Sequence, residues 1–444
     1  MPKNLKTKQN LKVLAITHLG IADITQKEAL GLVSAKNIVT NKASIVFEAA
    51  SINDAAKFAY KAQSVQRVVL LCAEYQLNAD DKFIDNLKLN LLKDDGITAL
   101  KKTLTSLSKK TFASRFLKQE SESEASSSLV TQEIEALIGE HLHETYKLKV
   151  DLKQPDIIFL SYFEDNKFYL GIDISGFDLS KRDYRLFTHP TALKGTIAYS
   201  LLRIGDYVLK DVLLDPFCGS GTIIIEAALF RSGLSPHYYK KDKFLLSKIK
   251  DLKIDFNKFD DASNLIKKQL SDKKADKKSS DKKKSDNNLA TSKESKKSIQ
   301  KETENNTDPG TNSDNGDIIG IDINFSAISS ARKNGKIANI LEYIKFSRMD
   351  ISWIDTKFKE KSLDKIITNP PKITRSVDPK DVEKIYKELF YQGEFVLRSK
   401  GTVTVITSSP NVMKQKAEEY KFKLLHEREL WHGKEMLNVL VFGK

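Results

Sequence analysis

The sequence predicts an α/β protein whose C-terminal half is a doubly wound sheet, preceded by two smaller α/β domains. From about residue 196 onward, short apolar runs alternate with segments of helical periodicity, the pattern of parallel strands joined by crossover helices. Before residue 176, strand and helix signals alternate at shorter intervals. The length of 444 residues fits two or three domains.

Composition excludes several classes of protein. With 40% hydrophobic and 30% charged residues the chain can bury real cores, so global disorder and fibrous classes are excluded. Two cysteines exclude a disulfide scaffold and a four-thiolate zinc site, and favour a reducing, cytoplasmic location. No apolar run is long enough to cross a membrane. The net charge of +14 favours a polyanionic partner, although a lysine-rich surface without such a role explains it equally well.

The first predicted domain spans residues 10–75. Its strands are expected at 11–16, 43–47 and 67–73, and its helices at 24–32 and 53–62. The second domain, 76–176, is expected to contain a helix at 131–142 and an antiparallel strand pair, 156–162 and 167–174, closed at Asp165-Asn166. The polar run 118–128, which precedes that helix, is predicted to be a loop.

The C-terminal half continues the alternation around one low-complexity tract. Strands are predicted at 212–214, 318–321, 343–346, 363–368 and 402–407, with helices at 222–230, 326–337 and 381–397. Residues 271–301 include 11 Lys and 5 acidic residues, and about 270–316 is predicted to be a disordered insertion. A tolerated surface insertion is favoured over an added attraction for phosphate.

The first strand of the doubly wound sheet runs into a glycine loop, where ligands of such sheets bind. Ile224 stands where a dinucleotide fingerprint has its third glycine, and no Gly-Lys-Thr follows, so the loop is no P-loop. A carboxylate at the strand tip suits a cationic ligand such as S-adenosylmethionine. The candidate cofactor residues here are Asp215, Pro216, Phe217, Cys218, Gly219, Ser220, Gly221 and Thr222.

Two further acidic residues follow later strands. Asp322 is positioned to accept the ribose hydroxyls of an adenosine, although the insertion places it far beyond the usual spacing. Asp350 is a weaker candidate to contact the adenine amine. Asn369-Pro370-Pro371 forms a rigid turn without proline N–H donors. The Asn369 side-chain oxygen and the Pro370 carbonyl are therefore expected to accept the N–H groups of an exocyclic amine.

Together these motifs resemble those of the THUMP-domain RNA guanine-N2 methyltransferases. The resemblance rests on Asp-Pro-Phe-Cys-Gly-Ser-Gly-Thr at 215–222 and Asn-Pro-Pro at 369–371. Residues 182–185 and 189–194 are similar to the family's linker, and residues 111–113, 155–156 and 171–173 to its THUMP module. Residues 10–75 look like its ferredoxin-like domain.

The resemblance implies a ferredoxin-like domain (10–75), a THUMP domain (76–176), a linker (177–195) and a Rossmann-like methyltransferase domain (196–444). It implies S-adenosylmethionine as cofactor, bound by the residues above with Thr191 and Leu193, and structured RNA, with tRNA favoured, as partner. Asn369, Pro370 and Pro371 would present guanine N2. Neither a metal nor a membrane is expected. Phosphate contacts are predicted for Arg182, Arg185, Lys194 and Lys372.

One residue departs from the family pattern. The family usually places an aromatic residue after Asn-Pro-Pro to stack on the target base, and this chain has Lys372. Lys372 could contact a phosphate instead, and Phe217 could supply the stack. An rRNA guanine-N2 methyltransferase, a DNA adenine-N6 methyltransferase and a catalytically silent RNA-binding protein stay open as alternatives. The target nucleotide and the oligomeric state are not predicted.

Overall fold

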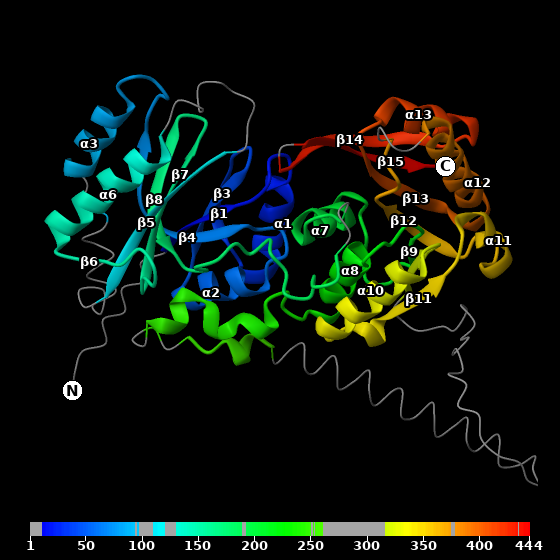
Figure 1. The fold of residues 1–444 in the computed structure, drawn as a ribbon, viewed down its shortest axis with the longest axis horizontal. Coiled ribbons are helices and arrows are strands. Elements are labelled where there is room, and N and C mark those ends of the chain that lie inside the picture. Colours follow the sequence, from blue (N-terminus) through cyan, green and yellow to red (C-terminus); the bar gives the residue numbers. More distant parts are fainter. Residues whose placement is uncertain are drawn as a thin grey trace, which may run out of the picture.

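The computed structural model describes residues 11–93, 96, 110–119, 130–188, 192–249, 252, 254–260, 316–373, 378–433 and 435–444. The predicted insertion lies outside this range except for Gly316, and so does most of the predicted loop 118–128. The described residues form two lobes along the long axis of the molecule, one from the N-terminal half and one from the C-terminal half (Figure 1).

The N-terminal lobe is built on one eight-stranded sheet of order β2-β3-β1-β4-β8-β7-β5-β6. The antiparallel pairing of β4 with β8 joins the two predicted small domains within this sheet. Its elements are β1 (Leu11–Ile16), α1 (Ala22–Val33), β2 (Lys36–Thr40), β3 (Ser44–Ala49), α2 (Ile52–Lys61), β4 (Arg67–Gln76), α3 (Phe83–Lys93), β5 (Thr111–Lys118), α6 (Thr131–Tyr146), β6 (Lys149–Val150), β7 (Ile157–Glu164) and β8 (Lys167–Asp173).

Local sequence explains these elements. Ser51 caps α2 by accepting the backbone N–H of Asp54, which satisfies a donor that the first helical turn leaves open. Asp165 and Asn166 both have positive φ, 47° and 62°, as a two-residue hairpin between β7 and β8 requires. The edge strand β2 was not predicted, because its side chains are mostly exposed and show no apolar alternation.

The C-terminal lobe has a seven-stranded sheet of order β11-β10-β9-β12-β13-β15-β14, parallel from β11 to β13. The last two strands pair antiparallel. Its elements are α7 (Gly195–Ile204), β9 (Leu213–Asp215), α8 (Thr222–Ser232), β10 (Ile318–Asp322), α10 (Phe325–Ile337), β11 (Ile344–Arg348), α11 (Ile354–Lys357), β12 (Leu363–Thr368), α12 (Pro379–Val396), β13 (Leu397–Thr407), α13 (Pro410–Glu419), β14 (Lys423–His432) and β15 (Glu435–Gly443).

Helices cover both faces of this sheet, which confirms the predicted doubly wound fold class. Leu213 packs with α7, α8 and α10 on one face, whereas its neighbour Leu214 packs with α12 and α13 on the other. Because β9, β10 and β12 run parallel, they end at one edge of the sheet, where Asp215, Asp322 and Thr368 are the last strand residues.

The two lobes contact each other through a common apolar cluster and through the β14–β15 hairpin. Ile21 and Ile24 of the N-terminal lobe belong to the same apolar cluster as α7 and α8. The β14–β15 hairpin reaches from the C-terminal sheet toward α1 (Figure 1), where Arg428 forms an ion pair with Asp23 at 2.7 Å. Gly20 has φ +92°, and a Cβ there would collide with the Glu429 carbonyl. In the described part of the chain, no helix combines the length and apolarity that crossing a membrane requires.

Candidate functional site

A cavity of about 1060 Å³ opens where β9, β10, β11 and β12 end. The glycine loop, the loops after β10 and β11, and the Asn-Pro-Pro corner all contribute to its wall. Of the candidate cofactor and catalytic residues, these line it: Leu193, Asp215, Pro216, Phe217, Cys218, Gly219, Ser220, Thr222, Asp322, Asp350, Asn369, Pro370 and Pro371. The predicted cofactor and acceptor motifs thus face one shared space.

The glycine loop is folded tightly against β10 and α10. Gly219 and Gly221 have φ of +52° and +86°, values that side chains rarely adopt. A Cβ at Gly219 would meet no atom within 4 Å, whereas one at Gly221 would lie 3.0 Å from the Cβ of Ala331. Gly219 therefore leaves open space beside the cavity. Gly221 does not line the cavity and instead allows α8 to begin close to α10.

Asp215 is the most perturbed acidic group of the cavity. Its Oδ1 accepts the hydroxyl of Thr368 at 2.6 Å and the backbone N–H of Phe217 at 3.2 Å. Its buried Oδ2 has no hydrogen-bond partner among the described residues. Burial raises the pKa of Asp215 to about 7, and the charge of Asp322 adds to the rise. A cation placed against Oδ2 would satisfy this carboxylate.

Asp322 and Asp350 occupy neighbouring loops of the cavity. Asp322 accepts the backbone N–H of Gly219 at 3.0 Å and that of Asn324 at 2.9 Å, so both of its oxygens are held in place. Each oxygen keeps a lone pair for a further donor such as a ribose hydroxyl. Asp350 accepts the N–H and the hydroxyl of Ser352, at 2.9 and 2.8 Å.

The Asn-Pro-Pro corner faces the glycine loop across the cavity. Thr368 ties the end of β12 to Asp215, and Tyr386 of α12 donates its hydroxyl to the Pro371 carbonyl at 2.9 Å. The corner therefore has a fixed position relative to the cofactor loop. No role was predicted for Thr368 or Tyr386, because only the fold brings Thr368 to Asp215 and Tyr386 to Pro371.

Lys372 lines the cavity but its ammonium is engaged within the protein. It lies 2.9 Å from both carboxylate oxygens of Glu435, the first residue of β15. Only 19% of the Lys372 side chain is exposed. The predicted phosphate contact of Lys372 therefore requires this ion pair to open, and it stays a prediction.

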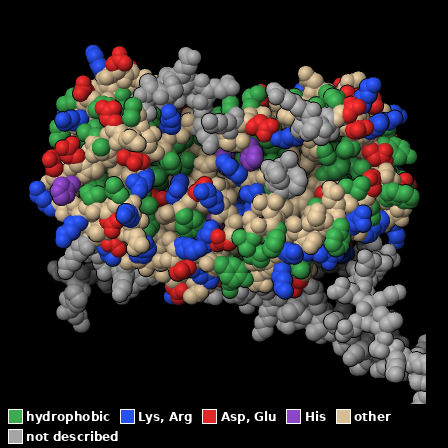
Figure 2. Space-filling view, viewed as in Figure 1, with side chains coloured by type: hydrophobic (Ala, Val, Ile, Leu, Met, Phe, Trp, Pro, Cys, Tyr) green, Lys and Arg blue, Asp and Glu red, His purple; other side chains and the backbone are tan. Residues whose placement is uncertain are grey.

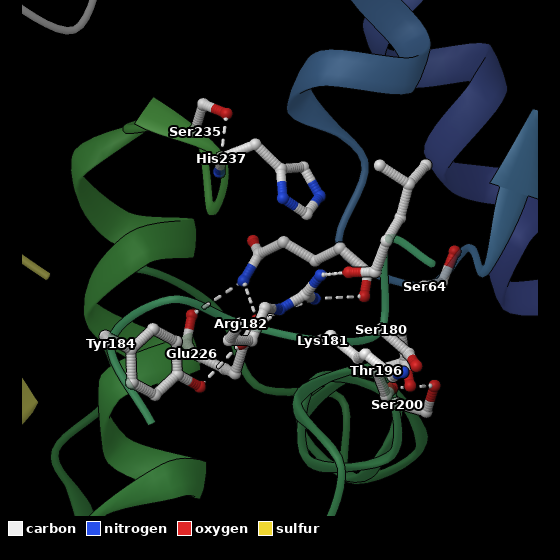
Figure 3. Close-up of polar contacts among 12 residues, drawn as sticks. Ser64, Ser180, Lys181, Arg182, Tyr184, Thr196, Ser200, Glu226, Ser235 and His237 are labelled. Atoms are coloured by element: carbon white, nitrogen blue, oxygen red, sulfur yellow. Dashed lines mark hydrogen bonds and ion pairs between the residues drawn. The ribbon is translucent and has the colours of Figure 1, made fainter. Parts of the chain in front are cut away.

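The predicted phosphate contact of Arg182 is wrong. Its side chain is fully buried, with Nε 2.8 Å from Oε1 of Glu226 and Nη2 2.6 Å from the Gln63 carbonyl (Figure 3). Tyr184 donates to the same carboxylate at 2.7 Å. Glu226 lies on α8 and Gln63 follows α2, so Arg182 joins the two lobes and has no exposed surface for RNA.

The other predicted phosphate ligands are less enclosed. Arg185 is half-buried and donates to the Ala192 carbonyl at 3.2 Å. Lys194 is half-buried, and its backbone N–H donates to Nε2 of His432 at 3.3 Å. Thr191 lies outside the described residues. On the face shown in Figure 2, lysines and arginines are interleaved with carboxylates over both lobes, so charge alone does not mark a path for RNA.

Cys218 is a poor candidate for a nucleophile. Burial holds the pKa of the Cys218 thiol well above its usual range, which keeps it a neutral, poorly nucleophilic group. Within the described ranges, no three His, Cys, Asp or Glu side chains are grouped as metal ligands.

Comparison with known families supports this picture. Residues 182–438 match the family described as RMKL-like, methyltransferase domain, and residues 97–173 match the THUMP domain. The first match covers more than half of the chain and includes the whole cavity wall.

Individual relatives agree with these matches. A Methanocaldococcus jannaschii protein named tRNA (guanine(6)-N2)-methyltransferase is 30% identical over 66% of this chain and 65% of its own length. A protein of that name from Archaeoglobus fulgidus is 26% identical over 67% and 60%. The chain thus spans less than two thirds of these relatives. The structure of a possible methylase from Clostridium difficile aligns with TM-score 0.70 at 22% identity, covering 98% of both chains.

Proposed function

Since the chain belongs to the RMKL-like methyltransferase domain family and carries a THUMP domain, we propose that it methylates guanine N2 in tRNA with S-adenosylmethionine. The observation that carries the proposal is the single cavity shared by the acidic glycine loop and the Asn-Pro-Pro corner. The glycine loop suits a cationic methyl donor, and the Asn-Pro-Pro corner suits an amine that accepts the methyl group. Two relatives are named for guanine 6 of tRNA, which makes that nucleotide the first candidate target.

The residues of the cavity fit this cofactor. The unpartnered Oδ2 of Asp215 suits a positively charged group, and Asp322 keeps lone pairs for a ribose diol. The open space at Gly219 lets a ligand approach the backbone closely. When bound, S-adenosylmethionine supplies an electrophilic methyl group on a sulfonium. A neutral Asp215 would offer less attraction to such a ligand, so cofactor binding should favour its ionised form.

The Asn-Pro-Pro corner would orient the acceptor. The Asn369 side-chain oxygen and the Pro370 carbonyl each accept one N–H of the guanine amine, which directs the nitrogen lone pair across the cavity. Thr368 and Tyr386 hold the corner so that little reorganisation is needed. The contribution of these residues is positioning and electrostatic stabilisation of the developing positive charge on nitrogen. A paired guanine must leave its stack to reach this depth.

Nucleoside mass spectrometry tests the proposal. Unmodified tRNA transcripts would be incubated with the protein and methyl-labelled S-adenosylmethionine, digested and separated. We expect labelled N2-methylguanosine, and sequencing of the labelled fragments should place it. A tRNA transcript with adenosine at position 6 is the matched control for that site. Absence of labelled N2-methylguanosine, although calorimetry shows cofactor binding, would overturn the assignment.

The same assay separates the alternatives. An rRNA guanine-N2 methyltransferase would label large-subunit rRNA transcripts and leave tRNA unlabelled. A DNA adenine-N6 methyltransferase would label duplex DNA at adenine. A catalytically silent protein would bind tRNA and label no nucleic acid. The THUMP match favours RNA over DNA.

A further inference from the structure

The residue that follows the Asn-Pro-Pro corner is tethered to the β14–β15 hairpin. Lys372 places its ammonium 2.9 Å from both carboxylate oxygens of Glu435, a charge-assisted contact that limits how far the end of the side chain can move. With 19% of its side chain exposed, Lys372 is shielded more than an ordinary surface lysine. The tether therefore holds one end of the acceptor corner.

The corner transmits the position of Lys372 to Asn369. Only Pro370 and Pro371 separate them, and both prolines have a fixed φ. The turn consequently has few backbone conformations open to it. Tyr386 restrains this turn at the Pro371 carbonyl from α12, and Glu435 restrains it from the opposite element, β15. Loss of either restraint lets the Asn369 oxygen drift.

Glu435 stands at the start of β15, within the β14–β15 hairpin. It pairs across the hairpin with His432, whose Nε2 accepts the backbone N–H of Lys194 at 3.3 Å. The backbone N–H of Trp431 donates to the Leu19 carbonyl at 3.4 Å in the N-terminal lobe. The hairpin tip thus contacts the corner, the start of α7 and the N-terminal lobe together.

We propose that Glu435, acting through Lys372, is a positioning residue that holds the Asn369–Pro371 corner in place for methyl transfer. The expected effect on the rate of methyl transfer rests on the proposed function. The restraint of the corner by the ion pair does not depend on that function. In this proposal Lys372 links the corner to β15. The family usually has a stacking aromatic residue at this place, and a phosphate contact was predicted for Lys372. A displacement of about 1 Å at a reacting group costs roughly 100-fold in rate, so a fractional displacement predicts a loss of about tenfold.

Charge reversal tests the pair in the full-length protein. K372E and E435K each place like charges opposite one another, and the double variant K372E/E435K restores an ion pair. We expect kcat on tRNA transcripts to fall about tenfold in each single variant and to recover to within about threefold of wild type in the double variant. The Kd for S-adenosylmethionine should be unchanged in all three.

The matched control is the ion pair between Lys414 of α13 and Glu427 of β14, at 2.8 Å. Reversing its charges should leave kcat unchanged. Hydrogen exchange of the peptide 363–373 provides a readout that needs no turnover, and it should accelerate in the single variants and recover in the double variant. If wild-type protein labels no tRNA, the proposed function fails while this exchange pattern still supports the tether.

Two results would overturn the inference. Single variants that keep both wild-type exchange and wild-type kcat would show that the ion pair does not hold the corner. A double variant as impaired as K372E alone, in exchange and in kcat, would show that Lys372 acts without Glu435. A rise in KM for tRNA alone, unrelieved in the double variant, would assign Lys372 to RNA contact.

Discussion

Replacing Asp215 by Asn should weaken binding of a cationic cofactor and stabilise the cofactor-free protein. The Asp215 carboxyl is buried, its Oδ2 lacks a partner among the described residues, and burial raises its pKa to about 7. Asn keeps an oxygen that can accept from Thr368 and Phe217 but removes the charge. Weaker cofactor binding and greater stability of the cofactor-free protein therefore both follow from removal of the buried negative charge.

The stability effect follows from the direction of the pKa shift. Because the pKa in the folded protein lies above its value of 3.8 in a model compound, this group contributes stability that is fully present below about pH 4. That contribution is lost as pH rises through about 7. Three pKa units correspond to about 4 kcal/mol as an upper bound. Local relaxation reduces the cost of a buried charge, so we expect Asp215→Asn to gain about 1–3 kcal/mol at pH 8.

The binding effect has a calculable pH dependence. If the cofactor binds only when Asp215 is ionised, a pKa near 7 predicts that Kd rises about tenfold between pH 8 and pH 6. In Asp215→Asn the Kd should be higher at pH 8, and its slope between pH 6 and pH 8 should be lost.

Calorimetric titration with S-adenosylmethionine at pH 6, 7 and 8 measures the binding, and urea unfolding without cofactor measures the stability. Asp317→Asn is the control, because Asp317 precedes the neighbouring strand β10 at its opposite end and pairs with Lys345 at 2.8 Å. It should leave the Kd unchanged. Wild-type affinity and pH slope in Asp215→Asn would refute the assigned role in charge recognition. A loss of stability would refute the inferred cost of burial.

Three other substitutions probe separate parts of the site. Asn369→Ala should lower kcat by roughly 100-fold or more with cofactor and tRNA affinity nearly intact; an equal loss of tRNA binding, measured by filter retention, would contradict its orienting role. Asp322→Ala should raise the cofactor Kd about 10- to 100-fold through lost charged hydrogen bonds, whereas an unchanged calorimetric Kd would remove Asp322 from the site. Arg182→Met should lower the free energy of unfolding by about 3–5 kcal/mol by leaving Glu226 buried without a counter-charge; a loss below about 1 kcal/mol in urea unfolding would contradict the role of Arg182 in joining the two lobes.

Local patterns in the sequence were enough for much of the fold and for the cofactor loop. The apolar run that ends in Asp215-Pro216 forms β9, and Gly219 and Gly221 take the positive φ that the turn needs. Asp322 and Asn369 were found because Asp322 ends one buried strand and Asn369 follows another, and strand ends of a parallel sheet meet at one edge. These features depend on neighbours in sequence, so one chain reveals them.

Strands with weak local signals were missed. β14 is largely exposed, and β15 is buried chiefly in its second half, so neither shows the alternation that marks a half-buried strand. They are strands because β15 pairs with β13 and β14 pairs with β15. Strands β4 and β8 are far apart in the sequence, yet they pair and join the two N-terminal units in one sheet. The prediction of separate domains divided near residue 76 did not anticipate this pairing.

The sequence by itself determined most of the candidate residues that line the cavity, whereas the tertiary structure decided which partners its cations have. Arg182 and Lys372 look alike in sequence as basic residues beside functional motifs. The fold buries the first against Glu226 of α8 and ties the second to Glu435 of β15. A motif is a local arrangement of backbone and neighbours, but the partner of a long charged side chain is whichever opposite charge the fold brings within reach.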